Sequence, residues 1–272
     1  MNLKLPPELA PFAEEIRATA RPSLRFRLQI APCGRTDSKV GGAPYWPEEL
    51  AYPTRPNGRP LSLLAQLNFA EMPPLPDFPS SGILQFFIDS GDVLLGLNLD
   101  NLRDSSGFRV IYHPEIRSDR LRSDFPPPDP GDYCGPLLDE VREYRLVFGP
   151  VEPQYLPLED YRFAAQLPNL NAFLEAEDDD WSLHDSYSAA EASPAHRIGG
   201  YAVFTQNDPR RFPEAEGGLP TDYELLFQLD SDCEEGGIDL MWGDAGVGNF
   251  FITPEDLKRR DFSRVAFSWD CH

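Results

Sequence analysis

The glycine-rich segment Trp242–Gly248 is the first part of this sequence whose residue types could do chemistry. Successive backbone N–H groups in such a segment can bind an anion, with Asp244 as a further polar contact. A phosphate-binding glycine loop normally leads into a helix, whereas the residues that follow, 249–252, are typical of a strand. The pattern therefore favours a tight turn that needs positive φ at glycine, and a ligand loop is the alternative.

A glutamine interrupts an apolar strand pattern twice, at Gln66 and at Gln228. Such a side chain either faces solvent or is buried with its amide hydrogen-bonded to backbone. We expect structural roles for both glutamines. The alternative is a ligand cleft between the two parts of the chain that carry them, lined by Gln66, Gln228, Trp242 and Asp244.

The sequence contains no pattern typical of a metal site or of a nucleophile. Its histidines are dispersed. Neither the acidic stretch 175–180 nor the alternating acids Asp230, Asp232 and Glu234 supply the glycine at the sixth position and the glutamate at the twelfth that a calcium loop requires. Neither a nucleophile elbow nor a Walker loop is present. We therefore predict no catalytic residue, no metal and no cofactor. The four histidines are His113, His184, His196 and His272.

Short strands separated by turns must position these residues, because 29 prolines exclude long uninterrupted helices. Apolar spacing and capping residues predict helices at 7–20, 158–167, 170–176 and 253–260, with a loop at 177–194. Strands are expected at 25–30, 61–68, 82–88, 108–112, 143–148, 197–204, 223–230, 246–252 and 263–269.

The order of motifs in residues 39–88 recurs in residues 197–252. In both stretches a basic residue and an aliphatic precede Gly-Gly, a Leu-Leu-x-Gln-Leu strand follows, and Phe-Phe-Ile ends the unit. The first glycine precedes the glutamine by 25 residues in one unit and by 29 in the other. This pattern predicts an internal duplication within a single domain, residues 1–272. The expected fold class is α+β, mainly antiparallel β-sheets with a few short helices.

Several motifs follow one another from about residue 25 to the C-terminus. They are Gly41-Gly42 with Pro44 and Pro47, Leu64–Asn68, Gly82–Phe87, His196–Tyr201 with Gln206, Leu226–Asp232, Met241–Gly246, and Phe250–Ile252 with Asp256-Leu257. Together they resemble the YwqG-like family, a bacterial domain of unknown function. The resemblance implies a sheet-rich α+β domain with no established catalytic residues, in a family with members in bacterial toxin and immunity settings.

The formal net charge of −21 bears on possible partners. It argues against nucleic acid and against an anionic membrane surface. No apolar stretch is long enough for a membrane helix, and the N-terminus does not have the pattern of a signal peptide, so we expect a cytoplasmic protein. The four cysteines form no Cys-x-x-Cys pair and are expected to be reduced.

The negative charge is concentrated in two stretches. Residues 163–196 contain seven acids and residues 212–257 contain twelve, and neither stretch has a lysine or arginine. The first unit, 39–88, has a net charge of −1, whereas the second, 197–252, has −8. Because the same fold places the same demands on both units, this difference points to function or solubility.

These observations predict a non-catalytic binding protein whose acidic C-terminal unit docks a basic protein partner, as an immunity protein would dock a cationic toxin. A small-ligand-binding protein or enzyme with a cleft between the units is the alternative, and acids that only maintain solubility are a third. The residues expected to form the acidic docking surface are Asp178, Asp179, Asp180, Asp232, Glu234, Glu235 and Asp239.

Overall fold

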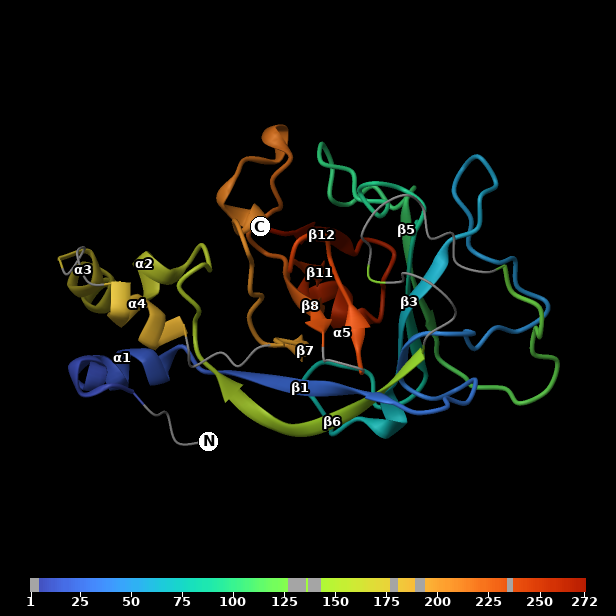
Figure 1. Cartoon of the computed structure of the whole chain (residues 1–272), viewed down its shortest axis with the longest axis horizontal. Coiled ribbons are helices and arrows are strands. Elements are labelled where there is room, and N and C mark those ends of the chain that lie inside the picture. Colours follow the sequence, from blue (N-terminus) through green and yellow to red (C-terminus); the bar gives the residue numbers. More distant parts are fainter. Residues whose placement is uncertain (1–4, 127–135, 137–142, 177–180, 189–193, 234–236) are drawn as a thin grey trace.

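Ten antiparallel strands form one sheet that curls into a nearly closed barrel (Figure 1). The computed structural model describes residues 5–126, 136, 143–176, 181–188, 194–233 and 237–272. In sheet order the strands are β12 (Ala266–Asp270), β11 (Val247–Ile252), β8 (Glu224–Asp230), β7 (Arg197–Gly199), β1 (Arg21–Ile30), β6 (Glu143–Gln154), β2 (Lys39–Gly41), β3 (Ser62–Asn68), β4 (Ile83–Ile88) and β5 (Phe108–His113). A small ribbon pairs β9 (Asp232–Cys233) with β10 (Asp239–Leu240).

The long strands β1 and β6 form the middle of the sheet and connect its two halves (Figure 1). Both extend beyond their predicted bounds, since β1 begins at Arg21 and β6 continues to Gln154. The register of this pair shifts near Arg25, opposite Gly149 and Pro150. A bulge leaves a residue outside the hydrogen-bond ladder, so it lets β6 accommodate a proline that a regular central strand would exclude.

The sheet order places the motifs of the two units at corresponding positions. Next to β6 follow β2, β3, β4 and β5, and next to β1 follow β7, β8, β11 and β12. The two Leu-Leu-x-Gln-Leu strands are β3 and β8, and the two Phe-Phe-Ile strands are β4 and β11. The arrangement agrees with two equivalent units, while their common origin stays a prediction.

The interior of the barrel is filled by aromatic rings from both halves. Phe86 of β4 lies 4.6 Å, centroid to centroid, from Phe227 of β8 and 4.8 Å from Phe250 of β11. Phe108 of β5 lies 5.5 Å from Phe267 of β12. All five rings are buried. The two units therefore meet through apolar packing, which stabilises the fold by removing aromatic surface from water.

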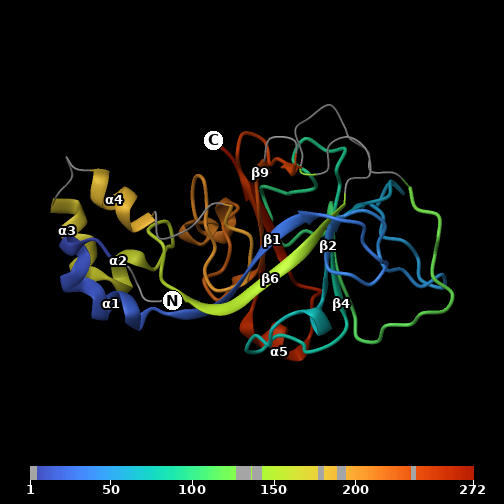
Figure 2. The ribbon, with the colours of Figure 1, turned by 60° about the horizontal axis from the view of Figure 1, so that its bottom comes forward.

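Most helices gather at one end of the molecule, beyond the sheet (Figures 1 and 2). They are η1 (Pro7–Phe12), α1 (Ala13–Ala18), α2 (Phe163–Gln166), α3 (Pro168–Ala176) and α4 (Trp181–Ser188). The predicted helix at 7–20 begins as a 3-10 helix that contains Pro11, and α4 forms where we expected a loop. A separate core that includes Leu9, Ile16 and Leu170 holds this layer together.

The remaining short helices follow strands. Helix α5 (Pro254–Arg259) begins as predicted, because Thr253 Oγ1 accepts a hydrogen bond from the backbone N–H of Asp256 at 3.2 Å. The 3-10 turns are η2 (Phe69–Glu71), η3 (Pro209–Arg211) and η4 (Glu214–Glu216). In the part of the chain that the structure describes, no helix is long and apolar enough to cross a membrane.

Candidate functional site

Gln66 lies buried on β3, and its amide binds the backbone on both sides of the first Gly-Gly pair. Its Oε1 accepts a hydrogen bond from the N–H of Tyr45 at 2.8 Å. Its Nε2 donates to the carbonyl oxygens of Asp37 and Arg35, both at 2.9 Å. The glutamine thus holds the loop after Gly41 against the sheet.

Gln228 makes the corresponding contacts in the second unit. Its Oε1 accepts from the N–H of Val203 at 2.8 Å, and its Nε2 donates to the carbonyl oxygen of Ala195 at 2.5 Å. Val203 lies four residues after Gly199, just as Tyr45 lies four after Gly41. Each glutamine therefore serves its own unit, and these contacts do not bring the two together around a common ligand.

The glycine pairs turn the chain away from the sheet. Gly41, Gly42, Gly199 and Gly200 all have φ between 66° and 73°. L side chains rarely adopt this conformation, so the backbone explains why both units have glycine here. A Cβ at Gly200 would also lie 2.3 Å from Oε1 of Gln154.

The residue opposite each glutamine on the neighbouring strand adds a further hydrogen bond to the same loop, with one difference between the units. On β4, Gln85 donates to the carbonyl oxygen of Tyr45 at 2.7 Å, and on β11, Asn249 donates to that of Val203 at 3.1 Å. His113 Nε2 lies 2.9 Å from Gln85 Oε1, whereas Asn249 Oδ1 is buried without a hydrogen-bond partner. Burial lowers the pKa of His113 from its usual 6.5 to about 4, so its imidazole is neutral near pH 7.

Trp242 and Asp244 belong to a tight turn that leads into β11. The N–H of Gly246 donates to the carbonyl oxygen of Trp242 at 2.8 Å, and Gly243 and Ala245 have positive φ. Trp242 is buried, and a Cβ at Gly248 would lie 2.3 Å from its indole ring. The Asp244 side chain is exposed. The turn brings neither residue into the hydrogen-bond network of the glutamines.

His196 and Asp232 form a buried pair that resembles part of a catalytic triad. The N–H of Asp230 donates to His196 Nδ1 at 3.0 Å, so the ring proton resides on Nε2. Nε2 lies 3.2 Å from a carboxylate oxygen of Asp232. With both ring nitrogens occupied, the imidazole has no site left to deprotonate a nucleophile.

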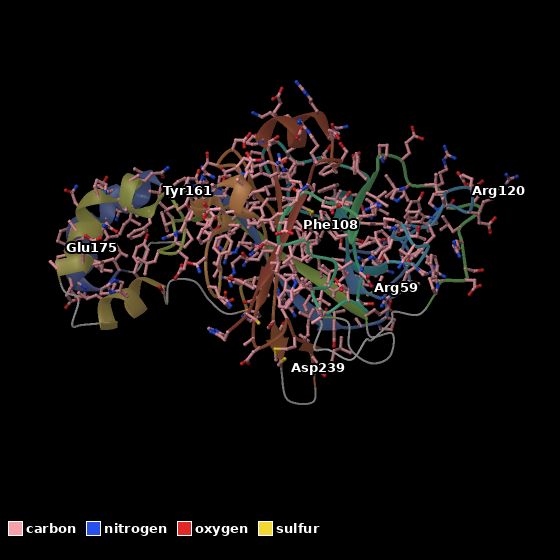
Figure 3. The ribbon with its side chains drawn as sticks, turned by 90° about the horizontal axis from the view of Figure 1, so that it is seen from above. Arg59, Phe108, Arg120, Tyr161, Glu175 and Asp239 are labelled. Carbon is pink, nitrogen blue, oxygen red and sulfur yellow. The ribbon has the colours of Figure 1, made fainter. Side chains whose placement is uncertain are left out.

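The predicted acidic surface is only partly described by the structure. Residues 178–180 and 234–235, which contain five of its seven acids, lie outside the described residues. Asp232 requires a correction, because its buried carboxylate faces His196 rather than solvent. Asp239 is exposed, and its backbone N–H donates to the Tyr144 hydroxyl at 3.1 Å. Figure 3 shows Asp239 at one edge of the molecule.

Sequence reasoning missed a buried cluster of charges where the helical layer meets the sheet. Asp160 binds Arg162, and Asp208 binds Arg210, each through two side-chain hydrogen bonds of 2.6–2.9 Å. Arg210 also donates to Asp160 at 3.1 Å, which links the two pairs. Tyr161 lies between the helices and the sheet in Figure 3, and both guanidinium groups are 4.9 Å from its ring.

This ion cluster fixes one loop to another rather than forming an open binding site. Glu224 at the start of β8 accepts from Arg162 at 2.8 Å and from Arg21 at 2.5 Å. The bound arginines hold the pKa of Asp160 below its usual range despite burial. The sequence signal was the tripeptide Asp-x-Arg, which occurs at 160–162 and again at 208–210.

The comparison with known families matches residues 38–271 to DUF1963, a domain of unknown function. The chain belongs to the DUF1963 family. No curated protein matches it. The matched region spans both units, yet β1 lies before it and forms the centre of the sheet. The DUF1963 fold of this chain is therefore completed by a strand outside the region that defines the family match.

The DUF1963 region brings no metal-binding group together within the described residues, because no three His, Cys, Asp or Glu side chains converge there. Cys33, Cys233 and Cys271 are free thiols. Asp230 lies beside the His196–Asp232 pair, and burial raises the pKa of its carboxyl group. Its carboxylate accepts a hydrogen bond from the N–H of Ala195 at 2.7 Å. These polar groups are used to hold backbone in place.

Proposed function

We propose that this protein is a non-catalytic binding protein whose acidic C-terminal half docks a basic protein partner. The observation that carries the proposal is the unequal charge of two similar units, −1 against −8. Several acids of the second unit have exposed side chains, among them Glu214, Glu216, Asp239 and Asp244. Acids gathered on one part of a surface steer a basic partner and raise its association rate.

The contacts of the chemistry-bearing residues support binding over catalysis. Gln66 and Gln228 are occupied by backbone groups of their own unit, and His196 is bonded at both ring nitrogens. The Arg162 and Arg210 guanidinium groups are held by Asp160 and Asp208. A general base needs an acceptor atom that the substrate can reach, and an anion-binding arginine needs N–H donors that the substrate can reach.

Two finer inferences accompany this proposal. The motifs that resemble those of YwqG-like proteins favour that finer assignment, and with it an immunity role towards a cationic toxin. The matching contacts of Gln66 and Gln228 favour an internal duplication. If the two units arose by duplication, the second one acquired carboxylates that the fold does not require.

Binding to the basic proteins encoded beside the gene tests the proposal. Isothermal titration calorimetry would compare the wild type with the triple variant Glu216→Gln, Asp239→Asn, Asp244→Asn. We expect an affinity that falls as salt is added and about tenfold weaker binding by the variant. The matched control removes three charges from the first unit, through Glu48→Gln, Glu49→Gln and Asp77→Asn, and should bind like the wild type. Absence of binding, or equal loss in both variants, would contradict the proposal.

A small-ligand site is a second candidate, favoured by one observation. The indole Nε1 of Trp242 is buried without a hydrogen-bond partner, and a ligand acceptor could satisfy it. A thermal-shift screen of metabolites tests this candidate. A hit that is lost in Trp242→Phe, which removes Nε1 and keeps an aromatic ring, would support it, and no hit would remove it.

A further inference from the structure

Two neighbouring loops present large hydrophobic side chains to solvent. Leu99 is 60 % exposed and Val93 is 51 % exposed on the loop between β4 and β5. Phe212, between β7 and β8, is 45 % exposed. Exposed apolar side chains are ordinary when scattered, but side chains gathered from two loops, with polar groups around them, are typical of an interaction site.

Contacts between the loops show that they lie side by side. Arg103 donates to a carboxylate oxygen of Glu214 at 2.5 Å. Gly217 has a φ of 80°, and a Cβ added there would lie 2.2 Å from the carbonyl oxygen of Leu99. A Cβ at Gly218 would lie 1.9 Å from the carbonyl oxygen of Phe212. Two consecutive glycines thus bring the backbones of Leu99 and Phe212 close together.

The barrel holds the first loop in place. Trp269 Nε1 on β12 donates to the carbonyl oxygen of Leu94 at 2.8 Å, and the N–H of Phe267 donates to that of Leu102 at 2.9 Å. The backbones of Gly96 and Gly107 approach so closely that neither position has room for a Cβ. A surface fixed in this way loses little conformational entropy on binding.

Acidic side chains surround the apolar ones. Asp100, Glu214 and Glu216 are exposed, and Asp92 and Asp104 lie on the same loop as Leu99. The nearby bases are already engaged, Arg103 by Glu214 and Arg211 by the carbonyl oxygens of Glu159 and Asp160. Arg109, whose charge acts on Asp104, donates to the carbonyl oxygen of Phe108, so five acids stand against three bases. An apolar centre within a negative rim is complementary to a segment that is apolar on one face and basic at its margins.

We propose that Leu99 and Phe212 form the surface that receives a basic amphipathic segment of a partner protein. The inference rests on the proposed function and assigns its binding surface. The apolar face of the segment covers Leu99 and Phe212, and its lysines or arginines pair with the exposed Asp100 and Glu216. Both loops rise on the same side of the molecule (Figure 1).

Fluorescence anisotropy with synthetic peptides tests the surface on the full chain. The probe is an amphipathic helix of leucine and lysine with all leucines on one face. We expect it to bind, and Leu99→Ser and Phe212→Ser each to weaken binding about tenfold. Ile30→Ser is the matched control, because Ile30 is 61 % exposed on β1. It should leave binding unchanged, and thermal melting should show all three variants folded.

The other outcomes distinguish failure of this surface assignment from failure of the proposed function. Peptide binding that is equal in Leu99→Ser, Phe212→Ser and wild type would overturn the surface while a basic partner could still bind elsewhere. Equal binding of a leucine–glutamate helix would contradict both, because charge would then play no part. A dimer in sedimentation that Leu99→Ser dissociates would assign the surface to a second copy of this chain and overturn the inference.

Discussion

Gln66 and Gln228 show how this protein uses a polar side chain inside an apolar strand. Each glutamine is buried and satisfies backbone groups of a loop that leaves the sheet at a glycine pair. The sequence allowed this role to be predicted, because a glutamine in a buried strand needs partners. The identity of those partners was not predictable, since it depends on where the loop returns over the sheet.

The first prediction concerns a variant that lacks one of these amides. Gln228→Leu leaves the N–H of Val203 without its partner, and the carbonyl oxygen of Ala195 keeps only the bond from Arg197 Nε at 3.3 Å. We expect the free energy of unfolding to fall by about 1–3 kcal/mol, since one buried unsatisfied group costs roughly that much. Urea unfolding measures it. Gln29→Leu, at an exposed position of β1, is the control and should change stability little.

The second prediction concerns the pH dependence that His113 imparts. The unfolded chain takes up a proton at this imidazole below about pH 6.5, whereas the folded chain does so only near pH 4. The contribution of the neutral His113 to the free energy of unfolding is therefore complete above pH 6.5 and is lost as the pH falls towards 4. Its full size is about 3 kcal/mol.

Comparison with His113→Gln isolates this effect. Burial raises the pKa of Asp230 and of Asp270, which acts in the opposite direction, but both acids remain in both proteins. We expect urea unfolding between pH 7 and 4 to show a shallower fall in stability for the variant, in line with the linkage relation. Parallel curves would mean that His113 titrates alike in the folded and unfolded chains.

At the scale of elements, the ion cluster joins segments that are far apart in the sequence. Asp160 and Arg162 precede the helices α2 and α3, while Asp208 and Arg210 belong to the loop before β8. The positions of most strands along the chain, the N-cap at Thr253 and the glycine turns followed from local sequence rules. The order of the strands in the sheet was not predicted. Nor did the cluster follow from these rules, because an Asp-x-Arg tripeptide does not reveal which distant partner it will meet.

The third prediction tests this junction. Arg210→Met removes a guanidinium that binds Asp208, Asp160 and the carbonyl oxygen of Tyr223. We expect the free energy of unfolding to fall by about 3–5 kcal/mol, because the buried carboxylate of Asp208 is left without a counter-charge, while Asp160 keeps Arg162. Thermal melting and urea unfolding measure the loss. Arg259→Met, which breaks only the exposed pair with Glu255, should cost at most about 0.5 kcal/mol.

At the scale of the whole molecule, the acids of the second unit have two kinds of role. Asp208, Asp230 and Asp232 are tied to backbone or to basic side chains inside the fold. Glu214, Glu216 and Asp244 are exposed. Counting charges along the sequence located the excess of acids. It could not tell the buried, paired acids from the exposed ones, because that depends on which loops fold back on the sheet. It also missed Leu99 and Phe212, which lie outside every motif.

Hydrogen exchange of the full chain, with and without the leucine–lysine helix, tests the central claim most directly. The account predicts slower exchange in two segments, 92–104 and 212–217, and unchanged exchange in 43–60, the loop held by Gln66. Both protected segments border the apolar surface of Leu99 and Phe212. Protection of residues 43–60, or of none of these segments while the peptide is bound, would contradict an acidic docking surface at this place.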